Sequence, residues 1–221
     1  MATIKTGQVG QFRGKIGKLV VYKWRGVIVG RSLPSKSSKP GTEAQLDQRK
    51  KFGRVGKFLG LFSEQIAVGW FSDKKKETPI NEAVSYHFKK ALKGNYPDYE
   101  IDLEKVVISR GRGKIDGGFS PVATAVPGAS VDISWITCNS TSRITQPTDK
   151  LTVVFLDENL RPGCVRAISY DYVAIRSDLT VRVDLPWDCR NHPVHAYMFF
   201  SSENGKLASK SEYLGIVNIQ E

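Results

Sequence analysis

The chain has 221 residues, of which 40% are hydrophobic and 25% charged, and its formal net charge at pH 7 is +11. This length is enough for one large or two small domains, and the composition excludes a wholly disordered chain and a collagen-like fibre. Three cysteines without a paired spacing, Cys138, Cys164 and Cys189, argue against a disulfide framework.

No apolar run approaches the roughly 18 residues that a membrane-spanning helix requires, so we expect no membrane span. The first residues lack a basic start followed by an apolar stretch and a cleavage site, which argues against a classical signal peptide. We therefore expect the protein in the cytoplasm or assembled into a particle.

The positive charge is concentrated at one end of the chain. Residues 1–60 hold 14 Lys or Arg and two acidic residues, a net charge of +12, while residues 61–221 hold 19 basic and 20 acidic residues, a net charge of −1. A basic first quarter before a neutral remainder predicts two functional regions, the first of which faces a polyanion or an acidic protein surface.

The first predicted element is a β-hairpin. Residues 19–22 and 27–29 are short β-prone runs, separated by Lys23, Trp24, Arg25 and Gly26. A loop of a few residues that contains glycine is typical of the connection between adjacent antiparallel strands. The Ser-, Pro- and Lys-rich residues 32–41 that follow predict an exposed connector.

Two amphipathic helices are predicted next. The first begins at Thr42, because Thr42 and Gln45 have the spacing of a capping box, and it extends to residue 68. Its apolar residues recur at steps of three and four: Phe52, Val55, Leu59, Phe62 and Ile66. The second covers residues 79–93, with Thr78 as the N-cap and Gly94 after its end, and we expect the two helices to pack together.

The hydrophobic period then changes from helical to alternating. Strand candidates are residues 106–109, 131–135, 151–156, 165–170, 179–185, 194–200 and 213–219. About seven short strands over some 120 residues are typical of an antiparallel immunoglobulin-like β-sandwich. The sequence thus predicts an α+β protein with a basic hairpin and helix-pair region over residues 1–97 and a β-sandwich domain over residues 98–221.

The strongest metal-site candidate is Cys189, His192 and His195, because a thiolate and imidazoles at steps of three can converge on one zinc ion. A structural zinc site normally has a fourth protein ligand, and the neighbouring sequence offers neither a second Cys pair nor a further His. We therefore expect a turn that leads into a strand containing His195, with the metal site as the alternative.

Motifs of enzyme active sites are missing from the sequence. Residues 10–16 lack the spacing and the Ser or Thr of a phosphate-binding loop, and the Gly-rich residues 110–118 do not match the dinucleotide fingerprint. No nucleophile elbow, HExxH pair or kinase motif set is present. We expect neither an enzyme nor a cofactor, although residues brought together only by folding escape such a search.

The basic first quarter provides the predicted binding site for a partner or a nucleic acid. Its members are Arg13, Lys15, Lys18, Lys23, Trp24, Arg25, Arg31, Arg49, Lys50 and Arg54. Cations can neutralise phosphates, and aromatic rings such as those of Tyr22 and Trp24 can stack on bases. Alternatively, the aromatic residues form the dry face of the hairpin and the cations only a solvated face.

Several segments of the chain are similar to an uncharacterised domain family of the Bacteroidota. They are residues 14–17 (GKIG), 21–26 (VYKWRG), 29–34 (VGRSLP), 40–52 (PGTEAQLDQRKKF), 83–86, 96–99 and 213–215. That family carries no established activity, so the resemblance implies no catalytic residue. Residues 14–52 also resemble short N-terminal modules of phage structural proteins, which favours a role in assembly.

Together these observations predict a non-enzymatic structural or interaction protein with a protein partner or a second copy of itself, as in a phage-like or other macromolecular assembly. Nucleic-acid binding through the basic region is the alternative. A third hypothesis, carbohydrate recognition by the sandwich, has only the aromatic candidates Trp187 and Tyr197.

Overall fold

The computed structural model describes residues 2–3, 13–24, 26–35, 39–71, 77–112, 115–137, 144–161 and 164–221. The chain divides into two compact units, Met1–Thr42 and Glu43–Glu221, which we call the amino-terminal unit and the body. Of the predicted binding residues, Arg25 lies outside the described part of the chain.

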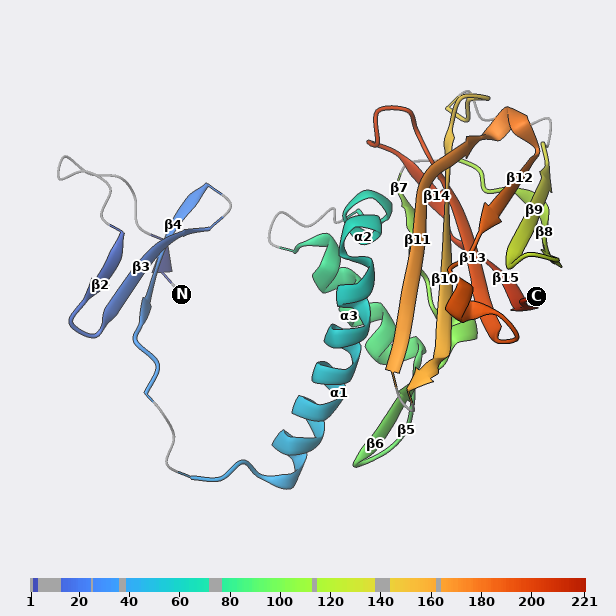
Figure 1. Cartoon of the computed structure of the whole chain (residues 1–221). Helices are drawn as coiled ribbons and strands as arrows, with labels where there is room; N and C mark the ends of the chain where they lie inside the picture. The colour runs from blue at the N-terminus through green and yellow to red at the C-terminus, as the bar shows by residue number, and fades with distance from the viewer. Residues whose placement is uncertain are drawn as a thin grey trace. The chain divides into compact units, whose positions relative to one another are not determined.

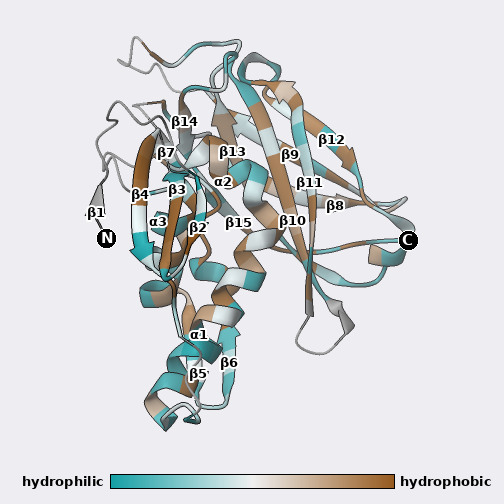
Figure 2. Cartoon of the chain, turned by 90° about the vertical axis from the view of Figure 1, so that its left-hand side faces the viewer, coloured by the Kyte–Doolittle hydropathy of each residue, from teal (hydrophilic) through white to brown (hydrophobic). Residues whose placement is uncertain are grey.

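The amino-terminal unit is a small antiparallel sheet. Its strands, in the order β1-β4-β3-β2, are β1 (Ala2–Thr3), β2 (Gly14–Ile16), β3 (Leu19–Trp24) and β4 (Val27–Ser32). Strands β3 and β4 form the predicted hairpin, and Gly26 in its turn has a positive φ of 85°, which a residue with a side chain rarely adopts. Figure 2 shows β4 hydrophobic at its start and hydrophilic at its end, as its sequence VIVGRS requires.

The body begins with helices. They are α1 (Glu43–Leu59), the 3₁₀ turn η1 (Gly60–Phe62), α2 (Ser63–Gly69) and α3 (Pro79–Lys90). The single helix predicted over residues 42–68 is thus interrupted at Gly60, where the backbone tightens into the 3₁₀ turn. Four members of its apolar stripe are buried, but Phe52 is 61% exposed, which corrects the predicted stripe.

The helix α3 begins as predicted. Thr78 is its N-cap, and the Thr78 hydroxyl accepts a hydrogen bond of 3.3 Å from the backbone N–H of Asn81, while Pro79 occupies the first turn. The helix ends at Lys90 rather than at residue 93. The residues that follow form the hairpin of β5 (Leu92–Asn95) and β6 (Asp98–Ile101), which the sequence did not predict.

The strands of the body form two further antiparallel sheets. The central sheet has the order β11-β10-β13-β14-β7, with β15 also paired to β13, and a three-stranded sheet has the order β12-β9-β8. Their bounds, after the 3₁₀ turn η2 (Leu103–Lys105), are β7 (Arg110–Arg112), β8 (Phe119–Val126), β9 (Ser130–Ile136), β10 (Lys150–Arg161), β11 (Cys164–Ile175), β12 (Thr180–Asp184), β13 (Pro193–Ser201), β14 (Ala208–Lys210) and β15 (Glu212–Asn218), with the short turns η3 (Arg176–Asp178) and η4 (Trp187–Cys189).

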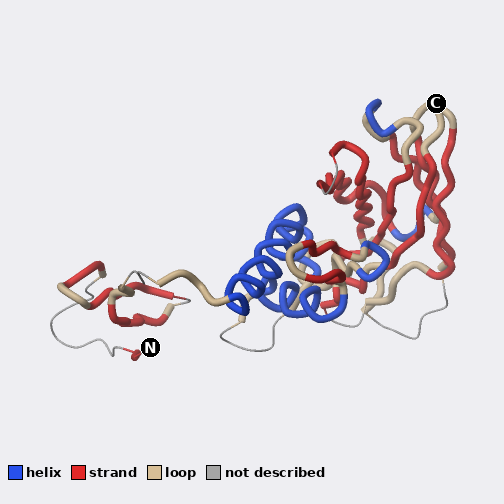
Figure 3. The backbone as a smooth tube through the Cα atoms, turned by 90° about the horizontal axis from the view of Figure 1, so that it is seen from below, coloured by secondary structure: helices blue, strands red, loops and turns tan. Residues whose placement is uncertain are grey.

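The central sheet separates two hydrophobic cores. Successive side chains of a strand point to opposite faces, so Val154 and Leu156 of β10 pack with the helices, while Val153 and Phe155 pack with β9 and β12 of the three-stranded sheet. The helices lie together on one side of the central sheet and the three-stranded sheet on the other (Figure 1, Figure 3). Both faces of β10 are buried from Leu151 to Leu156, which explains the apolar run over these residues.

One predicted strand, residues 106–109, is wrong. The N–H of Val107 donates to His87 Nε2 at 3.1 Å, and the N–H of Ile108 donates to the Ser211 hydroxyl at 3.0 Å. Side chains therefore satisfy a backbone that we expected to pair in a sheet. The strand of this region, β7, begins at Arg110.

The division of the chain differs from the expected boundary between residues 97 and 98. Residues of α1, α2 and α3 share one core with β10 and β13, so the helices belong to the same unit as the strands that follow them. The predicted antiparallel, strand-rich character is confirmed, while the immunoglobulin-like arrangement stays a prediction. None of the described helices combines the length and the apolar character that crossing a bilayer requires.

Candidate functional site

The sheet of the amino-terminal unit sorts the predicted binding residues onto two faces. Cross-strand partners share a face, and Lys15 and Arg31 both pair with Val20 of β3, one from each side. Val20 lies on the same face as Tyr22 and Trp24, because side chains alternate along a strand. We call the four residues Lys15, Tyr22, Trp24 and Arg31 the aromatic face.

The opposite face is aliphatic. It carries Leu19, Val21 and Lys23 of β3, with Ile16 of β2 and Ile28 of β4 as their cross-strand neighbours. Ile16 is 55% and Leu19 43% exposed, whereas Val21 is buried. Lys23 therefore belongs to a different surface from Lys15 and Arg31, although the sequence placed all three in one basic site.

On the aromatic face, charge and ring surface are available together. Lys15 and Arg31 are exposed, Trp24 is 38% exposed and Tyr22 is half-buried. The guanidinium carbon of Arg31 lies 5.7 Å from the centroid of the Tyr22 ring, a distance typical of a cation–π contact. This arrangement can offer both a stacking surface and positive charge to a ligand.

The remaining predicted cations lie elsewhere. Arg13 precedes β2 and Lys18 occupies the turn between β2 and β3, and both are exposed. Arg49, Lys50 and Arg54 lie on α1 and thus in the other unit. Contacts within the body already engage Lys50, whose ammonium lies 5.6 Å from the centroid of the Tyr96 ring and donates to the Pro97 carbonyl oxygen at 3.4 Å.

The metal-site candidates are not brought together. Cys189 is buried in the core between the two sheets, whereas His195 points to the helical side of the central sheet, where its Nδ1 lies 2.8 Å from the Tyr213 hydroxyl. His192 lies in the expected turn, and β13 contains His195 as predicted. Among the described residues, no group of three or more His, Cys, Asp and Glu could hold a metal ion.

The Cys189 thiol has a structural environment instead. Arg166 Nη2 lies 2.9 Å from Cys189 Sγ, and the same guanidinium binds Asp157 at 3.2 Å and Asp188 at 2.5 Å. Burial raises the pKa of the thiol above its ordinary value, against the opposing effect of Arg166. A raised pKa keeps the thiol protonated at neutral pH, which does not favour a nucleophile or a metal ligand.

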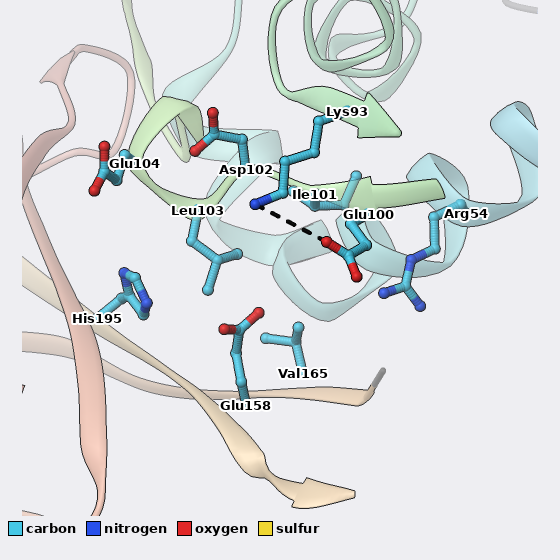
Figure 4. Close-up of a pocket in the computed structure, with 10 residues that line it drawn as sticks. All are labelled: Arg54, Lys93, Glu100, Ile101, Asp102, Leu103, Glu104, Glu158, Val165 and His195. Atoms are coloured by element: carbon cyan, nitrogen blue, oxygen red, sulfur yellow. Dashed lines mark ion pairs between the residues drawn. The ribbon is translucent and has the colours of Figure 1, made fainter. Parts of the chain in front are cut away.

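A cavity that no sequence motif indicated lies on the helical side of the central sheet (Figure 4). It has a volume of about 400 Å³ and combines residues of α1, β5, β6, β10, β11 and β13. The charged and titratable side chains in its lining are Arg54, Lys93, Glu100, Asp102, Glu104, Glu158 and His195. These residues are distant in sequence, so only folding brings them together.

Two of these carboxylates are paired with cations. Lys93 lies 4.0 Å from Glu100, and Lys105 binds Asp102 at 2.7 Å and holds the pKa of Asp102 below its ordinary value. Burial lowers the pKa of His195, against the opposing effect of Glu158 and Glu104, so this imidazole is neutral at pH 7. The described lining of the cavity contains no Ser, Thr or Cys as a nucleophile.

The two carbohydrate-binding candidates differ in accessibility. Trp187 is 74% exposed, and the guanidinium carbon of Arg190 lies 3.5 Å from the centroid of its ring. Tyr197 is fully buried, and its hydroxyl donates a hydrogen bond of 2.5 Å to the Leu103 carbonyl oxygen. Tyr197 cannot present its ring to a sugar, which corrects that part of the hypothesis.

Comparisons with known proteins add a family. A family model described as "Family of unknown function (DUF6266)" matches residues 10–215. No curated protein matches the chain. One solved structure, titled "Myokine structure", matches at a TM-score of 0.34 and 12% identity, over 49% of this chain and 100% of its own, a likeness too weak to support an argument. The resemblance to a family without an established activity is thus confirmed, while its taxonomic range and the phage likeness stay predictions.

Proposed function

The chain belongs to this family of unknown function, and we propose that it is a non-enzymatic interaction protein whose amino-terminal unit docks an acidic macromolecule. The body presents a second surface in this proposal. The resemblance of residues 14–52 to phage structural modules favours a place for the protein in a phage-like or other assembly. An immunoglobulin-like character of the body would suit such a role but is not required for it.

One observation carries the proposal. The boundary in the fold coincides with a boundary in charge: Met1–Thr42 contains nine Lys or Arg and no Asp or Glu, while Glu43–Glu221 contains 24 basic and 22 acidic residues. An independent unit without a single carboxylate repels no anionic partner at any point of its surface. Charge alone is compatible with an acidic protein or a nucleic acid.

The charged groups of the body support the non-enzymatic part of the proposal. The buried Asp157 and Asp149 are paired with Arg166 and Arg176, so their charges are compensated within the fold. In the cavity, the neutral His195 already contacts the Tyr213 hydroxyl. These contacts are those of structural networks, in agreement with the lack of a catalytic motif in the sequence.

Charge reversal in the full-length protein tests the proposal, with heparin as a polyanion of defined charge. We expect the triple variant Lys15→Glu, Lys18→Glu and Arg31→Glu to elute from a heparin column at much lower salt than the wild type. The matched control reverses three exposed lysines of the body, Lys89→Glu, Lys206→Glu and Lys210→Glu, and should shift elution far less.

Equal shifts of the two variants would show that only net charge matters and would contradict a dedicated unit. A second measurement addresses the assembly: the mass of the protein from its native host, by light scattering, should exceed that of one chain and fall to that of one chain as salt rises. A single chain without a partner at all salt concentrations would count against an interaction protein.

A further inference from the structure

We propose that the aromatic face of the amino-terminal unit binds single-stranded nucleic acid, with Tyr22 and Trp24 stacking on bases and Lys15 and Arg31 contacting phosphates. This inference rests on the proposed function, because it names the acidic macromolecule that the unit docks. Three properties of the described residues support it: the spacing of the rings, the position of the cations and the lack of any carboxylate in the unit.

The spacing of the rings favours a single strand over a duplex. Tyr22 and Trp24 are two residues apart on β3, so their Cα atoms are about 6.6 Å apart along the strand. Bases stacked in a duplex rise only about 3.4 Å per nucleotide, roughly half this distance. Adjacent bases therefore meet the two rings only when they are unstacked and drawn apart, which a single strand permits.

The cations lie where a strand stacked on these rings needs them. Lys15 on β2 and Arg31 on β4 both pair with Val20 of the central strand β3, and Val20 precedes Tyr22 by two residues. A phosphate backbone that runs along β3 past the two rings thus reaches positive charge on both sides at one end. Arg31 lies 5.7 Å from the Tyr22 ring and can extend its stacking surface.

The composition of the aromatic face, rather than the charge of the unit, favours nucleic acid over an acidic protein surface. With nine cations and no carboxylate in Met1–Thr42, no group of the unit repels a phosphate backbone. A protein interface has an apolar core, and two exposed apolar residues of the unit, Ile16 and Leu19, lie on the opposite, aliphatic face, whereas Val27 pairs with Trp24 and lies beside it. The aromatic face instead combines rings with cations, which is the composition of single-strand binding grooves.

The test measures binding of a labelled oligo(dT) of about 12 nucleotides to the full-length protein by fluorescence anisotropy, at salt concentrations from about 50 to 200 mM. We expect Trp24→Ala to weaken binding about 5- to 140-fold, which corresponds to the loss of about 1–3 kcal/mol of stacking on one base. Trp24→Phe keeps an aromatic ring and should restore most of the affinity, which excludes a loss of fold as the cause.

The cations provide a control on the same sheet. Lys15→Ala and Arg31→Ala should each reduce the slope of log affinity against log salt by about 0.7, the value for one phosphate contact with a single strand. Lys23→Ala removes the same charge from the opposite face of β3 and should leave this slope unchanged. A decrease by the same amount in all three variants would overturn the assignment of the face.

Two further ligands separate the failure of this inference from that of the proposed function. An oligonucleotide of the same length without bases carries the same phosphates and should bind at least 5-fold more weakly than oligo(dT). If heparin and the abasic strand bind as tightly as oligo(dT), the unit docks polyanions in general, so the inference fails and the proposed function stands. If neither heparin nor oligo(dT) binds at about 50 mM salt, both fail.

Discussion

The amino-terminal sheet and the central sheet of the body are both antiparallel, but their faces are used in opposite ways. On β13, Tyr197 and Phe199 face one core and Val194, Ala196 and Met198 face the other, and none is more than 2% exposed. The amino-terminal sheet instead exposes apolar or aromatic side chains on both faces, with Leu19 at 43% and Trp24 at 38%.

This difference indicates where function resides. A sheet that buries both faces contributes its side chains to stability and leaves few of them for a ligand. A small basic sheet with half-exposed rings gains less from burial and keeps its side chains for recognition. We therefore expect variants of the body to change stability and variants of the aromatic face to change binding.

The largest expected effect is the truncation of Trp70, which follows α2 and is fully buried against the rings of Tyr86 and His87. Trp70→Ala should lower the free energy of unfolding of the body by about 3–5 kcal/mol, because it leaves a cavity and removes the hydrogen bond of 2.8 Å from its indole to the Ile108 carbonyl. Urea denaturation followed by circular dichroism measures this loss.

The control for this prediction is Trp187→Ala, which truncates a ring that is 74% exposed and should cost no more than about 1 kcal/mol. Below the unfolding transition, Trp70→Ala should bind oligo(dT) as the wild type does. A parallel loss of binding would contradict the independence of the two regions.

Two glycine variants of the body should change its stability in opposite directions. A Cβ atom at Gly69 would lie 2.5 Å from the Cβ and 2.8 Å from the Cα of the fully buried Ser109. Gly69→Ala should therefore cost about 1–3 kcal/mol. A Cβ at Gly53, in the interior of α1, meets nothing within 4 Å, so Gly53→Ala should stabilise the protein by up to about 1 kcal/mol.

Thermal unfolding of both variants by differential scanning calorimetry measures this pair. A melting temperature that falls for Gly69→Ala and rises for Gly53→Ala would locate the tight packing where α2 ends. If Gly53→Ala were destabilising instead, the exposed side of α1 would have to contact something in the folded protein.

Elements with a strong local signal could be predicted from the sequence. The hairpin of β3 and β4 has β-prone runs around a glycine turn, and α3 has a capping Thr78 followed by Pro79. The strands β10 and β13 are rich in large apolar residues. By contrast, β8 has the sequence FSPVATAV with small, partly exposed side chains, and nothing in its pattern distinguishes a strand from a loop.

What depends on register or tertiary contact could not be predicted. Alternation along β3 already separates Tyr22 and Trp24 from Lys23, but only the pairing of β2 and β4 with β3 shows that Lys15 and Arg31 join the two rings. The cavity on the helical side is a second case. About a hundred residues separate Arg54 from Glu158, and tens of residues separate Glu158 from His195. No spacing in the sequence relates them.

The smallest expected effect is a pH dependence of stability that originates in the body. His87 is fully buried, its Nε2 accepts the N–H of Val107 at 3.1 Å, and its Nδ1 therefore carries the proton that it donates to the Ala83 carbonyl at 2.8 Å. A second proton would have to bind Nε2, where it would lie against the N–H of Val107. Burial accordingly lowers the pKa of His87 below its ordinary value.

The sign of this effect follows from linkage. Below the ordinary histidine pKa of about 6.5 the unfolded chain binds a proton that the folded chain does not, so stability is complete above this pH and is lost as the pH falls. The loss cannot exceed about 1.4 kcal/mol per pH unit for one histidine.

Urea denaturation at about pH 7.5, 6.5 and 5.5 measures this loss of stability. The variant His87→Gln keeps a hydrogen-bond donor and an acceptor but does not titrate, so it should flatten the dependence of stability on pH. Because burial also lowers the pKa of His195, the difference between wild type and variant is the quantity to compare. If the amino-terminal unit and the body are energetically separate, oligo(dT) affinity should show no matching change over the same pH range, since all three histidines of the chain lie in the body.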